Sequence, residues 1–120
     1  MAYSDPMEDT MPALLIATVR VDDTEAYKKY TALTPDIVAK YGGRFIVRGG
    51  EIDTLEGEPF TERMVVIEYP DMETARAMYN SAEYQEAMMF RQAASQARFL
   101  LVETVPEGVT APDAQVKTSG

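Results

Sequence analysis

The chain has 120 residues with 20 acidic and 11 basic side chains, and its net charge of −9 argues against binding to nucleic acids or to anionic membrane surfaces. Cysteine and histidine are both absent, which excludes disulfides, thiol nucleophiles, zinc sites built from Cys or His, and a histidine-ligated haem. Any chemistry must therefore use Asp, Glu, Tyr, Lys, Arg, Ser or Thr, and we expect no metal and no cofactor.

The distribution of apolar residues predicts one domain with polar ends. The N-terminal segment is acidic and lacks the features of a signal peptide, and no apolar run has the length of a membrane span, so we expect a cytoplasmic protein with no membrane partner. Apolar periodicity is confined to residues 13–105, which we expect to fold as a single domain. Residues 1–12 and 106–120 are rich in Pro, Gly, Asp and Thr, and they are predicted to be a mobile N-terminal extension and a mobile C-terminal tail.

The first half of the domain predicts a strand followed by a helix. Residues 13–21 are apolar and rich in β-branched side chains, as in a buried strand. Asp22 with Glu25 three residues later resembles a capping box that begins a helix. Pro35 predicts a kink near residues 31–34, and Gly42-Gly43 ends the helix. The apolar stripe expected on this helix consists of Ala26, Tyr30, Leu33, Ile37 and Tyr41.

The second half predicts two strands, two helical segments and a final strand. Residues 44–53 form the expected second strand, in which Gly49-Gly50 indicates a bulge or a close backbone approach. After a Gly- and Pro-containing loop, residues 63–69 form a third strand that should pair antiparallel with the second. Asp71 is expected to cap a helix that ends at Asn80, and Ser81 to begin a second helical segment that reaches about residue 97. Residues 99–105 form the last strand.

This order predicts an α+β fold of the split βαβ type, βαββαβ, with a four-stranded antiparallel sheet and its helices on one face. The first, third and fourth strands are apolar at both odd and even positions, although a strand with one face in water should alternate apolar and polar residues. The helices can cover only one face of the sheet. We therefore expect the other face to be covered by a second copy of the chain, in a homodimer formed through the sheet.

Several short segments of the domain occur in an order typical of one family. They are Tyr27 to Tyr30, Thr34-Pro35, the run KYGGRF at 40–45, the run VRGGE at 47–51, Leu55-Glu56-Gly57, the run VVIEYP at 65–70, and the run YNSAEY at 79–84. Together they resemble the domain of unknown function 1330 (DUF1330) family. The resemblance implies the dimeric α/β-barrel superfamily, which has a ferredoxin-like fold and includes cofactor-independent antibiotic-biosynthesis monooxygenases, muconolactone isomerases and haem-binding relatives of chlorite dismutase. It implies no established activity, and the absence of histidine disfavours the haem branch.

Two arginines on the predicted second strand are the first candidates for ligand binding. Arg44 and Arg48 are four residues apart, so a regular strand would place them on the same face, where they could clamp a carboxylate or an enolate. The alternative is that they pair with Glu51, Glu68 or Glu103, or that they extend to the edge of the sheet, where their charged groups reach water. We favour this pairing for Arg44 and leave Arg48 open, because the adjacent glycines would admit a ligand.

The second group of candidates surrounds the predicted helix break at Ser81. Tyr79 and Tyr84 lie on either side of it, where free backbone donors and phenol groups could meet a ligand. Arg91 lies seven residues after Tyr84 on the same helical face. Glu68, between Ile67 and Tyr69, would become a base if its surroundings were apolar. For each of these residues the alternative is a structural role in the core, in an ion pair or at a dimer interface.

Three functional hypotheses follow. The first is a homodimeric protein that binds a small organic molecule, with an anion as one option, between sheet and helices through Arg44, Arg48, Glu68, Tyr79, Ser81, Tyr84 and Arg91. The second is a cofactor-independent monooxygenase or isomerase that acts on a phenol or an enol. The third is a structural or interaction dimer that binds no ligand.

Overall fold

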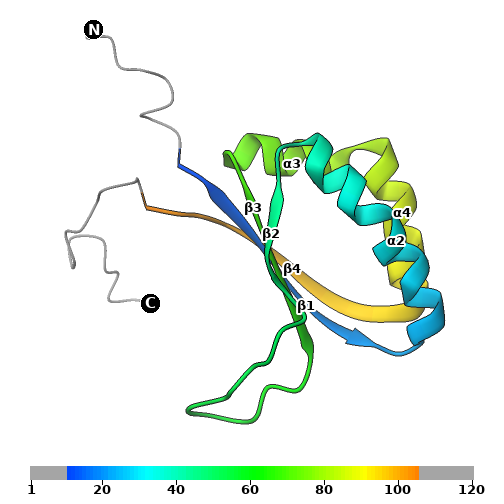
Figure 1. The fold of residues 1–120 in the computed structure, drawn as a ribbon, viewed down its shortest axis with the longest axis vertical. Coiled ribbons are helices and arrows are strands. Elements are labelled where there is room, and N and C mark those ends of the chain that lie inside the picture. Colours follow the sequence, from blue (N-terminus) through cyan, green and yellow to red (C-terminus); the bar gives the residue numbers. More distant parts are fainter. Residues whose placement is uncertain (1–10, 106–120) are drawn as a thin grey trace, which may run out of the picture.

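The computed structural model describes residues 11–105 and confirms the predicted fold class. Four antiparallel strands form one sheet in the order β2-β3-β1-β4, the ferredoxin-like arrangement, and the helices lie on one side of it (Figure 1). The predicted mobile segments 1–12 and 106–120 lie outside the described residues, except for residues 11 and 12. The elements are β1 (Ala13–Val21), α2 (Thr24–Lys40), β2 (Arg44–Arg48), β3 (Arg63–Tyr69), α3 (Met72–Asn80), α4 (Ala82–Ala94) and β4 (Ser95–Glu103).

The core lies between the sheet and the helices. Alternate residues of the central strand β1 face the helices and are almost fully buried: Ala13, Leu15, Ala17 and Val19. On the opposite face of the sheet, Leu100 and Val102 of β4 are 50% and 45% exposed, and they pair with Ile16 and Leu14 of β1. Both faces of the sheet are thus apolar, as the strand sequences predict, and one of them has no cover within the described chain.

Helix α2 begins one residue later than predicted, and the face that it turns to the core differs in part from the predicted stripe. Asp23 is the N-cap, since its Oδ1 accepts a hydrogen bond from the backbone N–H of Ala26 at 3.1 Å. Asp22, the predicted cap, instead pairs with Arg20 at 2.9 Å. The helix continues through Pro35. Its buried residues are Tyr27, Tyr30, Thr34, Ile37 and Val38. Of the predicted stripe, Tyr30 and Ile37 are buried, Ala26 and Tyr41 are partly buried against the core, and Leu33 is 43% exposed.

Strand β2 is shorter than predicted and contains its irregularity elsewhere. It ends at Arg48, not at residue 53, because Gly49 has φ +73° and turns the chain. The register with β3 shifts between Phe45 and Val47, so the bulge precedes Gly49-Gly50. Gly49 is closely approached by a side chain and not by another backbone, since a Cβ atom there would collide with the guanidinium of Arg63.

The break between α3 and α4 at Ser81 is confirmed, whereas the end of α4 was predicted too late. Ser81 caps α4 by accepting a hydrogen bond from the N–H of Tyr84 at 3.2 Å. The helix ends at Ala94, where the carbonyl accepts hydrogen bonds from the N–H groups of Asp22 and Asp23. Strand β4 therefore starts at Ser95, four residues before the predicted start, and it ends at Glu103.

Candidate functional site

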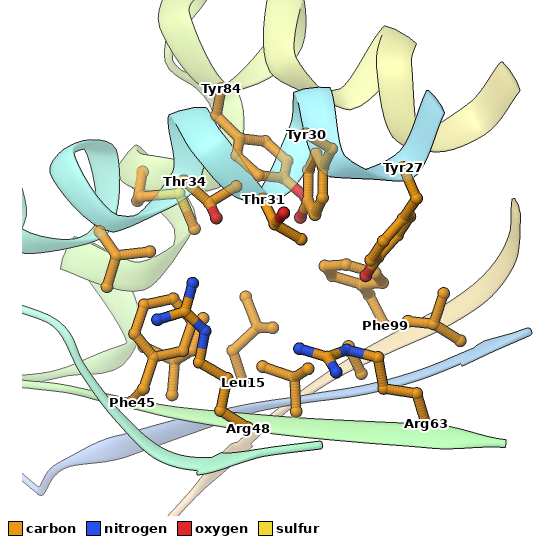
Figure 2. A pocket seen from close by; sticks show the side chains of 16 residues that line it. Leu15, Tyr27, Tyr30, Thr31, Thr34, Phe45, Arg48, Arg63, Tyr84 and Phe99 are labelled. Carbon is orange, nitrogen blue, oxygen red and sulfur yellow. The ribbon is translucent and has the colours of Figure 1, made fainter. Parts of the chain in front are cut away.

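A cavity lies between the sheet and helices α2 and α4 (Figure 2). It has about 510 Å³ of empty space including its mouth, but the centre of a water molecule reaches only about 30 Å³ of it. The cavity is therefore narrow, and a ligand of ring size would need long side chains at the mouth to move outward. The lining residues are Leu15, Ala17, Val19, Tyr27, Tyr30, Thr31, Thr34, Val38, Phe45, Arg48, Arg63, Val65, Ile67, Met78, Tyr84 and Phe99.

Two tyrosine hydroxyls meet on the helix side of this cavity. Tyr30 of α2 and Tyr84 of α4 have their Oη atoms 2.7 Å apart, and their rings are in an edge-to-face arrangement. Burial raises the pKa of both hydroxyls above the ordinary value. Both therefore stay protonated at neutral pH, and they act as hydrogen-bond donors and acceptors, not as bases.

Arg91 lies behind the tyrosine pair and is a buried cation without a carboxylate partner. Its side chain is 6% exposed, and its Cζ lies 4.2 Å from the centroid of the Phe99 ring and 5.7 Å from that of Tyr30. Within residues 11–105 no Asp or Glu oxygen lies within 4.0 Å of it. Its charge lowers the pKa of the Tyr30 and Tyr84 hydroxyls, although burial outweighs this effect. Aromatic faces thus take the place of a counter-ion.

Two further arginines reach into the cavity from the sheet side. Figure 2 shows the guanidinium groups of Arg48 and Arg63 facing the tyrosines across the cavity. The Arg48 guanidinium lies 4.3 Å from the centroid of the Phe45 ring, and the buried Nε of Arg63 has no hydrogen-bond partner in the described chain. No carboxylate of residues 11–105 pairs with either of them. Such arginines are suited to binding an external anion.

The structure separates the two arginines that the sequence placed on one face. The register shift in β2 puts Arg44 opposite Glu68 and Arg48 opposite Val65. Arg44 Nε binds Glu68 Oε1 at 2.8 Å on the open face of the sheet, whereas Arg48 lines the cavity. The prediction of a shared face is wrong because the bulge inverts the alternation between the two residues. The ion pair with a glutamate, which we favoured for Arg44 over ligand binding, is present.

The residues around Ser81 are only partly brought together. Tyr84 lines the cavity and Arg91 supports it, whereas Tyr79 lies in a neighbouring hollow between α3 and β4 and donates its hydroxyl to Met88 Sδ at 3.5 Å. The Ser81 hydroxyl donates to the carbonyl of Met78 and accepts from the N–H of Tyr84. The hydrogen-bonding groups of Ser81 thus serve the helix break.

Several cavity residues were not identified from the sequence. Tyr27, Tyr30 and Thr34 lie at helical spacing, so their shared polar face on α2 was a readable signal. Arg63, Val65 and Ile67 are two residues apart along β3, so their side chains share the face that turns to the helices. The alternation of the strand alone could therefore have placed Arg63 in the cavity. Thr31, Phe45 and Phe99 carried no such signal.

Residues 11–105 contain no group of three or more acidic side chains arranged to hold a metal ion. Among the same residues no helix is both long enough and apolar enough to cross a membrane.

Comparisons with known proteins agree with this architecture. Residues 12–105 match the family described as "Domain of unknown function (DUF1330)". No curated protein matches the sequence. A protein of unknown function from Rhodopseudomonas palustris has a similar structure, with TM-score 0.68, 23% identity, and coverage of 80% of this chain and 84% of that one.

More distant structures show the same fold. SnoaB, a cofactor-independent oxygenase from Streptomyces nogalater, has TM-score 0.53 and 15% identity, and the match covers 86% of this chain and 99% of that one. HapK from Hahella chejuensis has TM-score 0.58 and 15% identity, with coverage of 82% and 98%. At these identities the similarity establishes the fold and leaves the chemistry open.

Proposed function

Because the chain belongs to the DUF1330 family, a domain of unknown function, we propose from the cavity itself that this protein binds a small organic anion between the sheet and helices α2 and α4. The apolar walls would hold the body of the ligand, and the arginines would hold its charge. This site keeps Arg48, Tyr84 and Arg91 from the residues proposed from the sequence and adds Arg63 and Tyr30.

The observation that carries the proposal is that two arginines without a carboxylate partner face the same cavity. Among residues 11–105, Arg20, Lys28, Lys40 and Arg44 pair with carboxylates. Three basic residues outside the cavity, Lys29, Arg76 and Arg98, have no such partner and are exposed to water. Arg48 and Arg63, which face the cavity, have none within residues 11–105. An anionic ligand would supply the missing charge, since bidentate pairing with a carboxylate is the strongest interaction available to a guanidinium.

Calorimetric titration with benzoate tests the proposal. We expect saturable binding to the wild-type protein and a loss of affinity of about tenfold or more in Arg63→Met, because the charge-assisted hydrogen bonds disappear. Arg20→Met is the matched control, since it removes a guanidinium that pairs with Asp22 on the surface. Absence of binding across a panel of aromatic and aliphatic carboxylates would refute the proposal and favour the structural dimer.

A cofactor-independent monooxygenase or isomerase is the second candidate. SnoaB supports it through a shared fold, and the Tyr30 and Tyr84 hydroxyls could stabilise an enolate oxygen. However, no Asp or Glu lines the cavity within the described residues, so the site lacks a base for proton abstraction. Oxygen uptake with a quinol panel tests this candidate, and rates unchanged by Arg48→Ala and Tyr84→Phe would eliminate it.

The proposal also includes a homodimer and a cytoplasmic location. A second copy would cover the open sheet face that carries Leu100 and Val102, because an exposed apolar sheet face favours association. The cytoplasm is the compartment that we propose from the sequence.

A further inference from the structure

The guanidinium of Arg63 occupies the place where a side chain of residue 49 would lie. Gly49 follows the last residue of β2, and Arg63 is the first residue of β3. A Cβ atom on Gly49 would collide with Nη1 of Arg63 and would lie 2.9 Å from its Cζ, which is inside the ordinary contact distance of two carbon atoms. The bare backbone of Gly49 therefore leaves the space that this guanidinium fills.

The backbone of the sheet holds Gly49 next to Arg63. The N–H of Gly49 donates a hydrogen bond to the carbonyl of Met64 at 2.9 Å, and the preceding residue, Arg48, pairs with Val65. Gly49 has φ +73°, a conformation that glycine adopts without strain. The space beside Arg63 is thus a fixed feature of the end of β2.

Arg63 is the cavity arginine that gains most from an anionic ligand. It is partly buried, its buried Nε has no hydrogen-bond partner, and no carboxylate of residues 11–105 lies within 4.0 Å of it. Arg48 is more exposed to water, and its guanidinium lies 4.3 Å from the centroid of the Phe45 ring. An unpaired donor that is withdrawn from water costs free energy, and a ligand that accepts from it recovers that cost.

We infer that Gly49 is a positioning residue for the anion site. Its missing side chain lets the guanidinium of Arg63 lie across the end of β2 and face the cavity (Figure 2). Arg63, more than Arg48, then gives the cavity its preference for an anion over a neutral molecule of the same shape. The inference rests on the proposed function and names the residues that determine its selectivity.

Two probes of nearly equal shape test the inference. Benzoate and benzamide share the ring and a planar end group, and only benzoate carries a charge. We expect the wild-type protein to bind benzoate about tenfold more tightly, because charge-assisted hydrogen bonds are the stronger ones. The readout is the dissociation constant of benzamide divided by that of benzoate, since a general structural defect would weaken the binding of both probes.

Substitution of Gly49 should lower this ratio to the value found in Arg63→Met, while benzamide still binds. Gly49→Ala adds the Cβ atom that displaces the guanidinium. Gly49→Asn adds the same atom in a residue that tolerates positive φ better than alanine, so it serves where Gly49→Ala fails to fold. Gly57→Ala is the matched control, because Gly57 has φ +93° but a Cβ there would meet nothing within 4 Å. It should keep the wild-type ratio.

A double variant shows through which arginine Gly49 acts. Gly49 also adjoins Arg48 in the chain, so a substitution could disturb that arginine instead. If Gly49 acts through Arg63, the addition of Gly49→Ala to Arg63→Met should change the ratio by less than about twofold.

The outcomes that overturn the inference differ from those that overturn the proposed function. A wild-type ratio in Gly49→Ala and Gly49→Asn would contradict the inference, and so would an equal loss on adding Gly49→Ala to the wild-type protein and to Arg63→Met. In both cases the binding of benzoate to the wild-type protein would still stand. If the wild-type protein does not bind benzoate, or binds benzamide equally well, the proposed function fails and the inference fails with it.

Discussion

Gly43 is a position where the fold leaves no room for a side chain. A Cβ atom there would lie 2.5 Å from Cε1 of Tyr69 and 2.8 Å from Cγ1 of Val38, so helix α2 and strand β3 approach each other across a bare backbone. Packing thus requires the second glycine of the KYGGRF run. This requirement cannot be inferred from composition or from the hydrophobic pattern. Gly42 beside it is required for a different reason, its φ of +75°.

Gly43→Ala is predicted to destabilise the protein by about 1–3 kcal/mol, the usual cost of overpacking a core. The matched control is Gly50→Ala, because a Cβ at Gly50 would meet nothing within 4 Å. Urea denaturation of the two variants measures the difference. Equal stabilities would show that Tyr69 and Val38 move aside without cost.

The buried tyrosines predict a particular response to alkaline pH. Burial raises the pKa of Tyr30, Tyr69 and Tyr84 in the folded protein, whereas in the unfolded chain it is about 10. A raised folded pKa adds stability below pH of about 10 that is lost as the pH rises further, because only the unfolded chain then releases the protons. We expect these three tyrosines to ionise together with unfolding.

Absorbance at 295 nm, followed beside far-ultraviolet circular dichroism, measures this coupling. In Tyr30→Phe and Tyr84→Phe the stability should fall less steeply above pH of about 10, since one proton fewer is linked to unfolding. Ionisation of all tyrosines before any loss of dichroism would contradict the burial of the pair.

The strands and helices could be predicted from the sequence because their signals are local. Strand β1 and strand β3 have the predicted bounds, and both helices after β3 begin after the predicted caps, Asp71 and Ser81. The bulge in β2 could not be placed, since it depends on pairing with a strand that is distant in sequence. This bulge of one residue places Arg48 on the helix side of the sheet, away from Arg44. The candidate site therefore contains Arg48 without Arg44.

The start of helix α2 provides a test at the level of a single element. Asp23 accepts the hydrogen bond from the N–H of Ala26, so Asp23→Ala should destabilise the protein by about 1 kcal/mol. Asp22→Ala should cost less, because Asp22 only pairs with Arg20 on the surface, where both side chains are about half exposed.

Thermal unfolding at low salt and at 1 M salt distinguishes the two effects. The cost of Asp22→Ala should disappear at high salt, because screening removes an exposed ion pair. The cost of Asp23→Ala should largely persist, because a hydrogen bond at close range is lost. A loss of stability that is larger in Asp22→Ala than in Asp23→Ala and independent of salt would show that Asp22 is the helix cap, as predicted from the sequence.

The whole molecule has one sheet face that its own helices do not cover. Leu100 on this face is 50% exposed, and we predict that it is buried against a second copy. Sedimentation equilibrium at micromolar concentration should show a dimer for the wild-type protein and a monomer for Leu100→Glu. Met89→Glu, on the outer side of α4 at a residue that is 67% exposed, should remain dimeric. A monomeric wild-type protein would contradict the prediction.

The central claim is that the cavity holds an organic anion at Arg48 and Arg63. The most direct measurement is a crystal structure of the protein grown with benzoate. We predict electron density for the ring between the sheet and the tyrosines, with the carboxylate within hydrogen-bonding distance of both guanidinium groups. An empty cavity at saturating benzoate, with Arg48 and Arg63 paired to carboxylates of the protein itself, would contradict the account.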